Sequence, residues 1–99
     1  MRRLIAVLTV HRTELERFRT FERATARIMA NHGGEIEHAY ELAGDGDRVR
    51  ELHIVRFPDD ATLDAYRADP ALTALASERA RAVISTEIWP AEPLPRYGS

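Results

Sequence analysis

Histidines are the side chains of this 99-residue sequence best suited to transfer protons near neutral pH. Three of the four lie in or beside segments with the composition of strands, and Tyr40 shares a strand alternation with one of them. Such a group could polarise a carbonyl or a phenol of a bound molecule and transfer a proton. We therefore predict four catalytic candidates: His53, His38, His11 and Tyr40.

The same residues have a structural alternative. His11 can simply end a strand, and His53 can be an interior histidine whose hydrogen bonds are all satisfied. If His38 and His53 both face a closed interface, the case for catalysis loses its main support.

Four further residues are predicted to bind substrate: Tyr66, Arg56, Glu87 and Trp89. A glutamate in a strand covered on both faces is costly unless it is paired, and we expect Arg56 to pair with Glu87. The alternative is an ion pair in a dimer interface. For Tyr66 and Trp89 the alternative is packing in the core.

A metal site needs three or four converging nitrogen or oxygen ligands. His38, His53 and either Glu51 or Glu87 could supply them, but no metal-binding spacing supports this set. The chain has no cysteine, which excludes thiolate catalysis and disulfides. It also lacks a phosphate-binding loop and a dinucleotide-binding fingerprint. We therefore expect neither a metal nor a cofactor.

The bulk properties indicate one domain in residues 1–89, followed by a proline-rich tail or arm in residues 90–99. The net charge of −2 argues against a nucleic-acid partner. No apolar run approaches the roughly 20 residues that span a bilayer, so we expect no membrane partner and a cytoplasmic location.

The order of expected elements is β-α-β-β-α-β. Strands are expected over residues 3–10, 35–42, 49–57 and 83–89, with a turn at 43–47. The first helix should start at a Thr13–Glu16 capping box and end at Gly33. Its expected apolar stripe is Leu15, Phe18, Phe21, Thr25, Ile28, Met29 and His32.

Aspartate residues predict two helix starts in the second helical region. Asp59 or Asp60 should cap a helix that holds Leu63 and Tyr66, and Asp69 followed by Pro70 should start another. The second of these helices is expected to bury Leu72, Leu75, Ala76 and Ala80. In the first hairpin strand, Ile36, His38, Tyr40 and Leu42 are expected on one face. In the last strand, Val83, Ser85, Glu87 and Trp89 are expected to share one alternation.

These elements predict a ferredoxin-like α+β fold, with a four-stranded antiparallel sheet and both helical regions on one face. His11, Tyr40 and His53, with Glu51 nearby, should converge at one edge of the sheet. Because the strands carry apolar residues on both faces, the open face should be covered by a second copy, giving a homodimer and a barrel.

Three motifs carry a resemblance to a known superfamily. They are His32–Gly34 before the second strand, Ile54–Asp59 at a strand-to-helix junction, and Ala65–Pro70. In these the chain resembles the dimeric α+β barrel superfamily, in particular DUF1330 and antibiotic-biosynthesis monooxygenase-like domains, over residues 3–89. The Asn and Trp pattern of quinone-forming oxygenases is not matched, since Asn31 and Trp89 lie elsewhere.

The resemblance implies a pocket between sheet and helices that takes a small apolar or aromatic ligand. It implies a cofactor-independent oxygenase, cyclase or isomerase acting on an aromatic or polyketide-like molecule by His and Tyr acid–base chemistry. The alternative is a non-catalytic ligand-binding or stress-related dimer. Handling of haem or metal is a third and weaker alternative.

Overall fold

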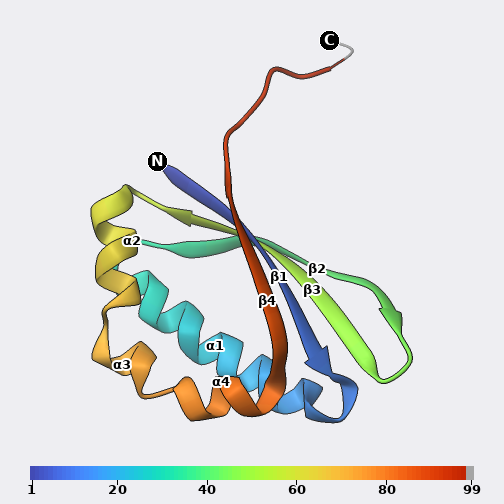
Figure 1. Cartoon of the computed structure of the whole chain (residues 1–99). Helices are drawn as coiled ribbons and strands as arrows, with labels where there is room; N and C mark the ends of the chain where they lie inside the picture. Colours follow the sequence, from blue (N-terminus) through green and yellow to red (C-terminus); the bar gives the residue numbers. More distant parts are fainter. Residues whose placement is uncertain (98–99) are drawn as a thin grey trace.

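The computed structural model describes residues 1–97, and Figure 1 shows a single sheet with helices against one of its faces. In chain order the elements are β1 (Arg2–His11), the 3-10 turn η1 (Arg12–Glu14), α1 (Leu15–Asn31), β2 (Glu35–Asp45), β3 (Arg48–Phe57), α2 (Asp60–Arg67), α3 (Pro70–Thr73), α4 (Ala76–Ala82) and β4 (Val83–Ala91). No helix within residues 1–97 is both long and apolar enough to cross a membrane.

The sheet has the order β2-β3-β1-β4, and every neighbouring pair is antiparallel. The central strands are therefore β1 and β3, as right-handed crossovers require. Helices α1 to α4 all lie on the same face (Figure 1). The predicted ferredoxin-like α+β fold is confirmed.

Most helix boundaries follow the predicted local chemistry. The Asp59 side chain accepts from Thr62 N–H at 2.8 Å, and Asp69 accepts from Ala71 N–H at 2.9 Å, so both are N-caps. Gly33 has φ +76° and ends α1 in the left-handed conformation that glycine adopts at little cost.

The predicted capping box at Thr13 is wrong. Residues 12–14 form a 3-10 turn, and α1 begins at Leu15 without a side-chain cap. The amide of Arg12 donates instead to Asp47 O at 2.7 Å, in the β2–β3 turn. This bond holds the chain against the hairpin before the helix can begin.

The second helical region differs from its prediction because it breaks into α3 and α4. Ala82 is the residue that α4 buries, whereas Ala76 and Ala80 are exposed. Leu72 and Leu75 are half-buried. The strand that follows also runs on to Ala91, two residues beyond the expected boundary of the domain.

Two irregularities in the sheet correct the expected strand faces. The β2 register shifts between Ile36 and His38, so Ile36 packs with the core while His38 faces the other side. The β1–β4 register shifts between Thr9 and Val10, which places Val83 against the core. A β-bulge inverts the alternation of the residues beyond it, and uniform alternation cannot predict it.

The core lies between the sheet and the helices. The predicted α1 stripe is confirmed at Phe18, Phe21, Thr25 and Met29, all of which are buried. Two apolar clusters fill the two ends of this layer. One contains Leu8, Val10, Phe18, Phe21, Val49 and Ala82, and the other contains Leu4, Met29, Val55, Phe57 and Leu63.

Candidate active site

A cavity of about 460 Å³ lies between the sheet and the helices. This volume is within the range of small-molecule sites. Its wall uses side chains from both core clusters, from Leu8 and Phe21 of the first to Met29, Val55 and Phe57 of the second. The wall is mainly apolar, but it also carries ionisable side chains whose chemistry is informative.

His53 is one of these polar groups. It lies on the helix-facing alternation of β3 and is only 4% exposed. Its neighbours across the sheet are Ala6 on β1 and Ala39 on β2. Alanine on both sides leaves lateral room for the imidazole ring beside the cavity.

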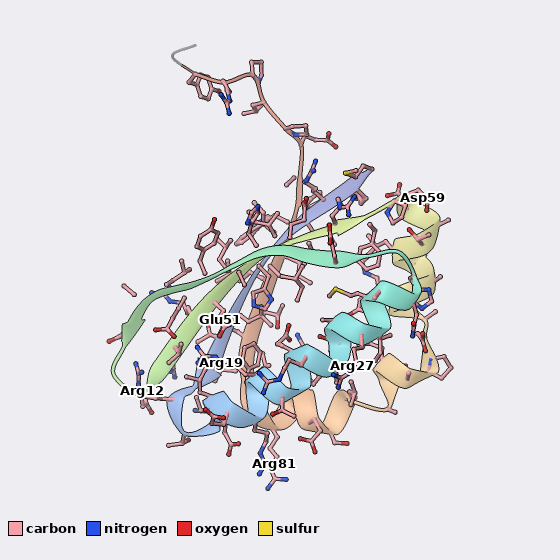
Figure 2. All side chains as sticks on the ribbon, turned by 180° about the vertical axis from the view of Figure 1, so that it is seen from behind. Arg12, Arg19, Arg27, Glu51, Asp59 and Arg81 are labelled. Atoms are coloured by element: carbon pink, nitrogen blue, oxygen red, sulfur yellow. The ribbon has the colours of Figure 1, made fainter. Side chains whose placement is uncertain are left out.

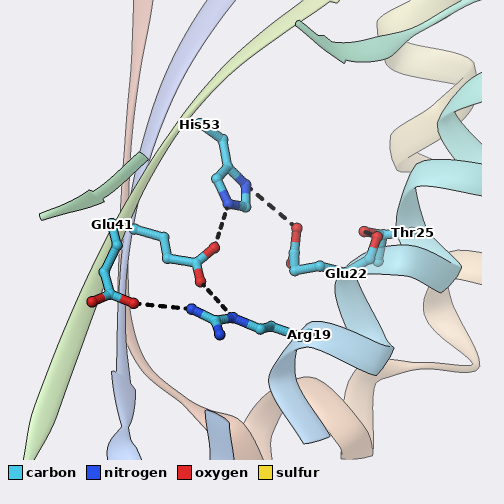
Figure 3. A network of polar contacts seen from close by, with 6 residues as sticks. Arg19, Glu22, Thr25, Glu41 and His53 are labelled. Carbon is cyan, nitrogen blue, oxygen red and sulfur yellow. Dashed lines mark hydrogen bonds and ion pairs between the residues drawn. The ribbon is translucent and has the colours of Figure 1, made fainter. Parts of the chain in front are cut away.

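A chain of charged groups fixes the His53 ring (Figure 3). His53 Nε2 lies 2.9 Å from Glu51 Oε1, and Arg19 Nε donates to Glu51 Oε2 at 3.3 Å. Arg19 also donates to the exposed Glu41 at 3.0 Å. Because Arg19 holds Glu51 as an acceptor, Nε2 of His53 is the donor. The second ring nitrogen, Nδ1, therefore faces away from Glu51.

Glu22 meets that second nitrogen, with its Oε2 3.4 Å from His53 Nδ1. It projects from α1 towards His53 (Figure 3). It also lines the cavity. Burial raises the pKa of the Glu22 carboxyl, and the negative charge of Glu51 acts in the same direction. The charges of His53 and Arg79 oppose this rise. Glu22 and Nδ1 are thus placed to share a proton.

Tyr66 lines the same cavity from α2. Burial, followed by the negative charge of Glu22, raises the pKa of its phenol to about 12. Its ring packs against Phe57 at 5.2 Å and edge-on to His32 at 6.3 Å. A phenol that stays protonated near neutral pH can donate a hydrogen bond to a ligand oxygen.

The expected convergence of His11, Tyr40 and His53 is wrong. His53 faces the helices, whereas Tyr40 is opposite Leu52 and His11 is opposite Arg48, both on the open face. His11 and Tyr40 are exposed, and so is His38, whose ring stacks on Tyr40 at 6.3 Å. The alternation of β3 and the bulge in β2 send these groups to opposite sides.

The expected pair of Arg56 and Glu87 is also wrong. Arg56 forms ion pairs with Glu35 and Glu37 on β2, the neighbour of β3 on the side away from β4. Glu87 and Trp89 are exposed and lie on the open face of β4, opposite Val7 and Ile5. Of the four predicted substrate-binding residues, Tyr66 is the one that lines the cavity.

Three charged cavity residues were not singled out from the sequence as site residues, namely Glu22, Arg67 and Arg79. Glu22 lies on the buried stripe of α1, four residues after Phe18 and three before Thr25. An ionisable residue on an apolar stripe was the signal that could have found it. Arg79 on α4 carried no such signal, because its place at the cavity depends on the break between α3 and α4.

The arrangement supports proton transfer at an apolar site. Figure 2 shows Glu51 and Arg19 together between the sheet and α1. The Arg19–Glu51 pair sets the imidazole tautomer, and the Glu22–His53 pair presents the exchangeable proton to the cavity. Across the described part of the chain, no three His, Asp or Glu side chains gather in a way that could hold a metal ion.

Comparison with known proteins identifies the fold class. No family model matches the sequence. No curated protein matches it either. Solved structures do match, among them an uncharacterised NIPSNAP domain protein from Burkholderia xenovorans, at a TM-score of 0.72 and 13% identity over 95% of both chains.

Two other solved structures extend this likeness. A candidate antibiotic biosynthesis monooxygenase from Nitrosomonas europaea matches at a TM-score of 0.74 and 13% identity, over 96% of this chain and 100% of that one. SnoaB, a cofactor-independent oxygenase from Streptomyces nogalater, matches at 0.62 and 13% over 100% of both chains. The chain therefore has the ferredoxin-like α+β fold of NIPSNAP and antibiotic biosynthesis monooxygenase structures.

Proposed function

We propose that this protein is a small cofactor-independent enzyme that removes a proton from an aromatic or polyketide-like molecule bound between sheet and helices. The observation that carries the proposal is the Glu22–His53 pair, an acid–base couple on the wall of an apolar cavity of ligand size. Buried pairs of this kind mark functional sites more often than solvated ones do.

The proton-transfer step follows from the hydrogen-bond order. Glu51, held by Arg19, accepts from Nε2 of His53 and stabilises the imidazolium once Nδ1 has gained a proton. Glu22 takes the proton from the ligand C–H or O–H and shares it with Nδ1. The ligand keeps the electron pair of the broken bond and becomes an enolate or a phenolate. Tyr66 supplies a neutral phenol that donates to the developing oxyanion.

The same deprotonated intermediate can lead to all three reaction types that the family resemblance implies. Returning the proton to another carbon gives an isomerase, and attack of the enolate on a carbonyl gives a cyclase. Transfer of electrons from the carbanion to dioxygen gives an oxygenase. The likeness of the fold to SnoaB, a cofactor-independent oxygenase, supports the third type. The motif resemblance to DUF1330 supports membership of the same superfamily but does not indicate which reaction is catalysed.

A non-catalytic ligand-binding domain is the second candidate. It is favoured by the contacts of His53, because each of its ring nitrogens already lies near a carboxylate. A histidine held in this way stabilises the junction of β3 and α1 without any chemistry. The cavity would then bind a small apolar molecule and leave it unchanged.

We also propose that the protein is a homodimer that pairs its open sheet faces. Half-buried Ile5, Val7, Leu52 and Ile54 share this face with the exposed Trp89. Glu87 and Arg50 lie among them, and neither forms an ion pair with another described residue. A second copy of the same face would cover this apolar centre and offer these charges partners of opposite sign.

The test of catalysis is deuterium incorporation into 2-tetralone, whose C–H bonds beside the carbonyl are acidic, followed by NMR in D2O. We expect the wild-type protein to accelerate the exchange. Glu22→Gln should lose about 100-fold of the acceleration, the usual contribution of a general base, and His53→Gln should lose a similar factor. Glu16→Gln, on the exposed side of α1, is the control and should match wild type.

Two results would overturn the catalytic proposal. One is a folded wild-type protein that binds the ketone without exceeding the exchange rate of buffer, which selects the ligand-binding candidate. The other is a Glu22→Gln variant with undiminished exchange, which would show that the base lies elsewhere.

A further inference from the structure

The opening of the cavity is defined by the lining residues that are exposed. They come from the end of α2, from α3 and α4, and from β4, and they are Arg67, Thr73, Ala76, Arg79 and Ile88. Glu22 and His53 are set deeper, on α1 and on the central strand β3. The cavity is thus polarised, with an acid–base pair inside and two arginines at the opening.

Arg79 is held at this opening by β4. Its guanidinium donates to the hydroxyl of Thr86, which also lines the cavity. Its positive charge reaches inward, because it lowers the pKa of both Glu22 and Tyr66 against the upward effect of burial. An arginine has five N–H donors in a planar fork, and the Thr86 bond uses one of them.

Neither Arg79 nor Arg67 forms an ion pair with a carboxylate among residues 1–97. This differs from Arg3, Arg19 and Arg56, each of which has a glutamate partner. Two unpaired guanidinium groups at the opening of an apolar cavity suit a ligand that brings its own negative charge.

We infer that the cavity binds an amphipathic ligand that carries a carboxylate, with Arg79 and Arg67 holding the carboxylate at the opening. The apolar body of the ligand then lies between the sheet and α1, and its far end reaches Glu22. This inference rests on the proposed function only in taking the same cavity as the binding site. It adds the class of substrate that the cavity binds. It makes Arg79 a specificity-determining residue for an aromatic or polyketide-like acid.

The test is calorimetric binding of two probes of the same shape, 2-naphthoate and the neutral 2-naphthamide, near neutral pH. Wild-type protein should bind 2-naphthoate about 10-fold more tightly, as expected for a charge-assisted hydrogen bond. Arg79→Gln should reduce this preference to about twofold, and Arg67→Gln should reduce it by a smaller factor. Added salt should weaken binding of the naphthoate but not of the naphthamide.

Arg81→Gln is the matched control, because Arg81 lies on the same helix, does not line the cavity and points away from the body of the protein (Figure 2). It should keep the full preference. Arg79→Lys, which retains the charge, should keep part of it and guards against a folding defect in Arg79→Gln. Equal binding of both probes to wild type, or an unchanged preference in Arg79→Gln, would overturn the inference.

The binding experiment and the exchange experiment test the two proposals independently. A naphthoate preference without exchange into 2-tetralone leaves the carboxylate site standing and removes the catalytic proposal. Exchange that depends on Glu22, with no preference for naphthoate, supports the catalytic proposal and removes the carboxylate site.

Discussion

Glu22 is a carboxyl placed where a helix would ordinarily carry an apolar residue. Its cost is visible in the raised pKa, because burial disfavours the charged form. The groups that face it are His53 and Glu51 from β3, Arg79 from α4 and Tyr66 from α2. His53 and Arg79 lower its pKa and so offset part of this cost. A residue that lowers stability but keeps an acid–base partner at 3.4 Å is typical of a functional site.

This pKa shift predicts how stability depends on pH. A carboxyl with a raised pKa in the folded state binds more protons when folded than when unfolded. Its contribution therefore falls as pH rises from the ordinary value of 4.5 towards the raised value. Glu22→Gln removes this loss. We expect the unfolding free energy of Glu22→Gln, relative to wild type, to increase with pH across this window.

Urea unfolding of both proteins at a series of pH values measures this difference. Glu16→Gln, which alters an exposed carboxyl of the same helix, should show a smaller dependence on pH. A flat difference between Glu22→Gln and wild type would mean that Glu22 is solvated in the folded protein.

At the scale of elements, the end of α1 sets the position of the helix over the sheet. Gly34 N–H donates to Met29 O at 2.9 Å and Gly33 N–H donates to Ala30 O at 3.1 Å, which is the Schellman pattern. A Cβ added to Gly34 would lie 2.4 Å from the ring of Phe57, a residue only 1% exposed. The close approach of helix end and strand end therefore requires glycine at this position.

Gly34→Ala should lower the unfolding free energy by about 3 kcal/mol, the upper range for overpacking a core. Gly46→Ala is the comparison, since Gly46 has φ +61° in the β2–β3 turn and nothing near its Cβ position. It should cost about 1 kcal/mol, from the backbone conformation alone. Chemical denaturation measures both.

Replacing the Phe57 ring by a smaller side chain separates the steric clash from other causes of the lost stability. In a Phe57→Leu background, Gly34→Ala should cost less than it does in wild type, because a smaller side chain can move aside. An unchanged cost in that background would contradict the proposed contact, and Gly46→Ala should cost the same in both backgrounds.

At the scale of the whole molecule, the sheet is covered on one face only (Figure 1). The cavity belongs to the covered face, and the predicted residues His38, Tyr40, Glu87 and Trp89 belong to the open one. A partner on the open face would bury them without entering the cavity. The monomer fold thus separates the proposed chemistry from the proposed assembly.

Light scattering coupled to gel filtration tests the homodimer. We expect a mass of about twice 11.2 kDa, falling to that of one chain in Leu52→Arg, because an unpaired charge would be buried in the apolar centre of the face. Ala30→Arg, which adds the same charge on the exposed side of α1, should remain dimeric. A wild-type mass of one chain at micromolar concentration would exclude the dimer.

The order of elements, the fold class and most helix ends could be predicted from the residues alone. These depend on local chemistry, such as the Asp59 and Asp69 caps and the glycines after α1, or on a regular apolar period such as the α1 stripe. A cap joins residues only two or three apart, and the apolar stripe of a helix has a regular period. Both can therefore be recognised without knowledge of distant contacts.

Which polar residues meet depends on contacts between segments that are far apart in the sequence. The bulge in β2 turned His38 and Tyr40 away from His53, and the α3–α4 break placed Arg79 at the cavity. Glu22 lies beside His53 because this part of α1 packs over the middle of β3. A face inverts with a single extra residue, and contacts between distant segments depend on where whole elements cross, so neither is encoded in local spacing.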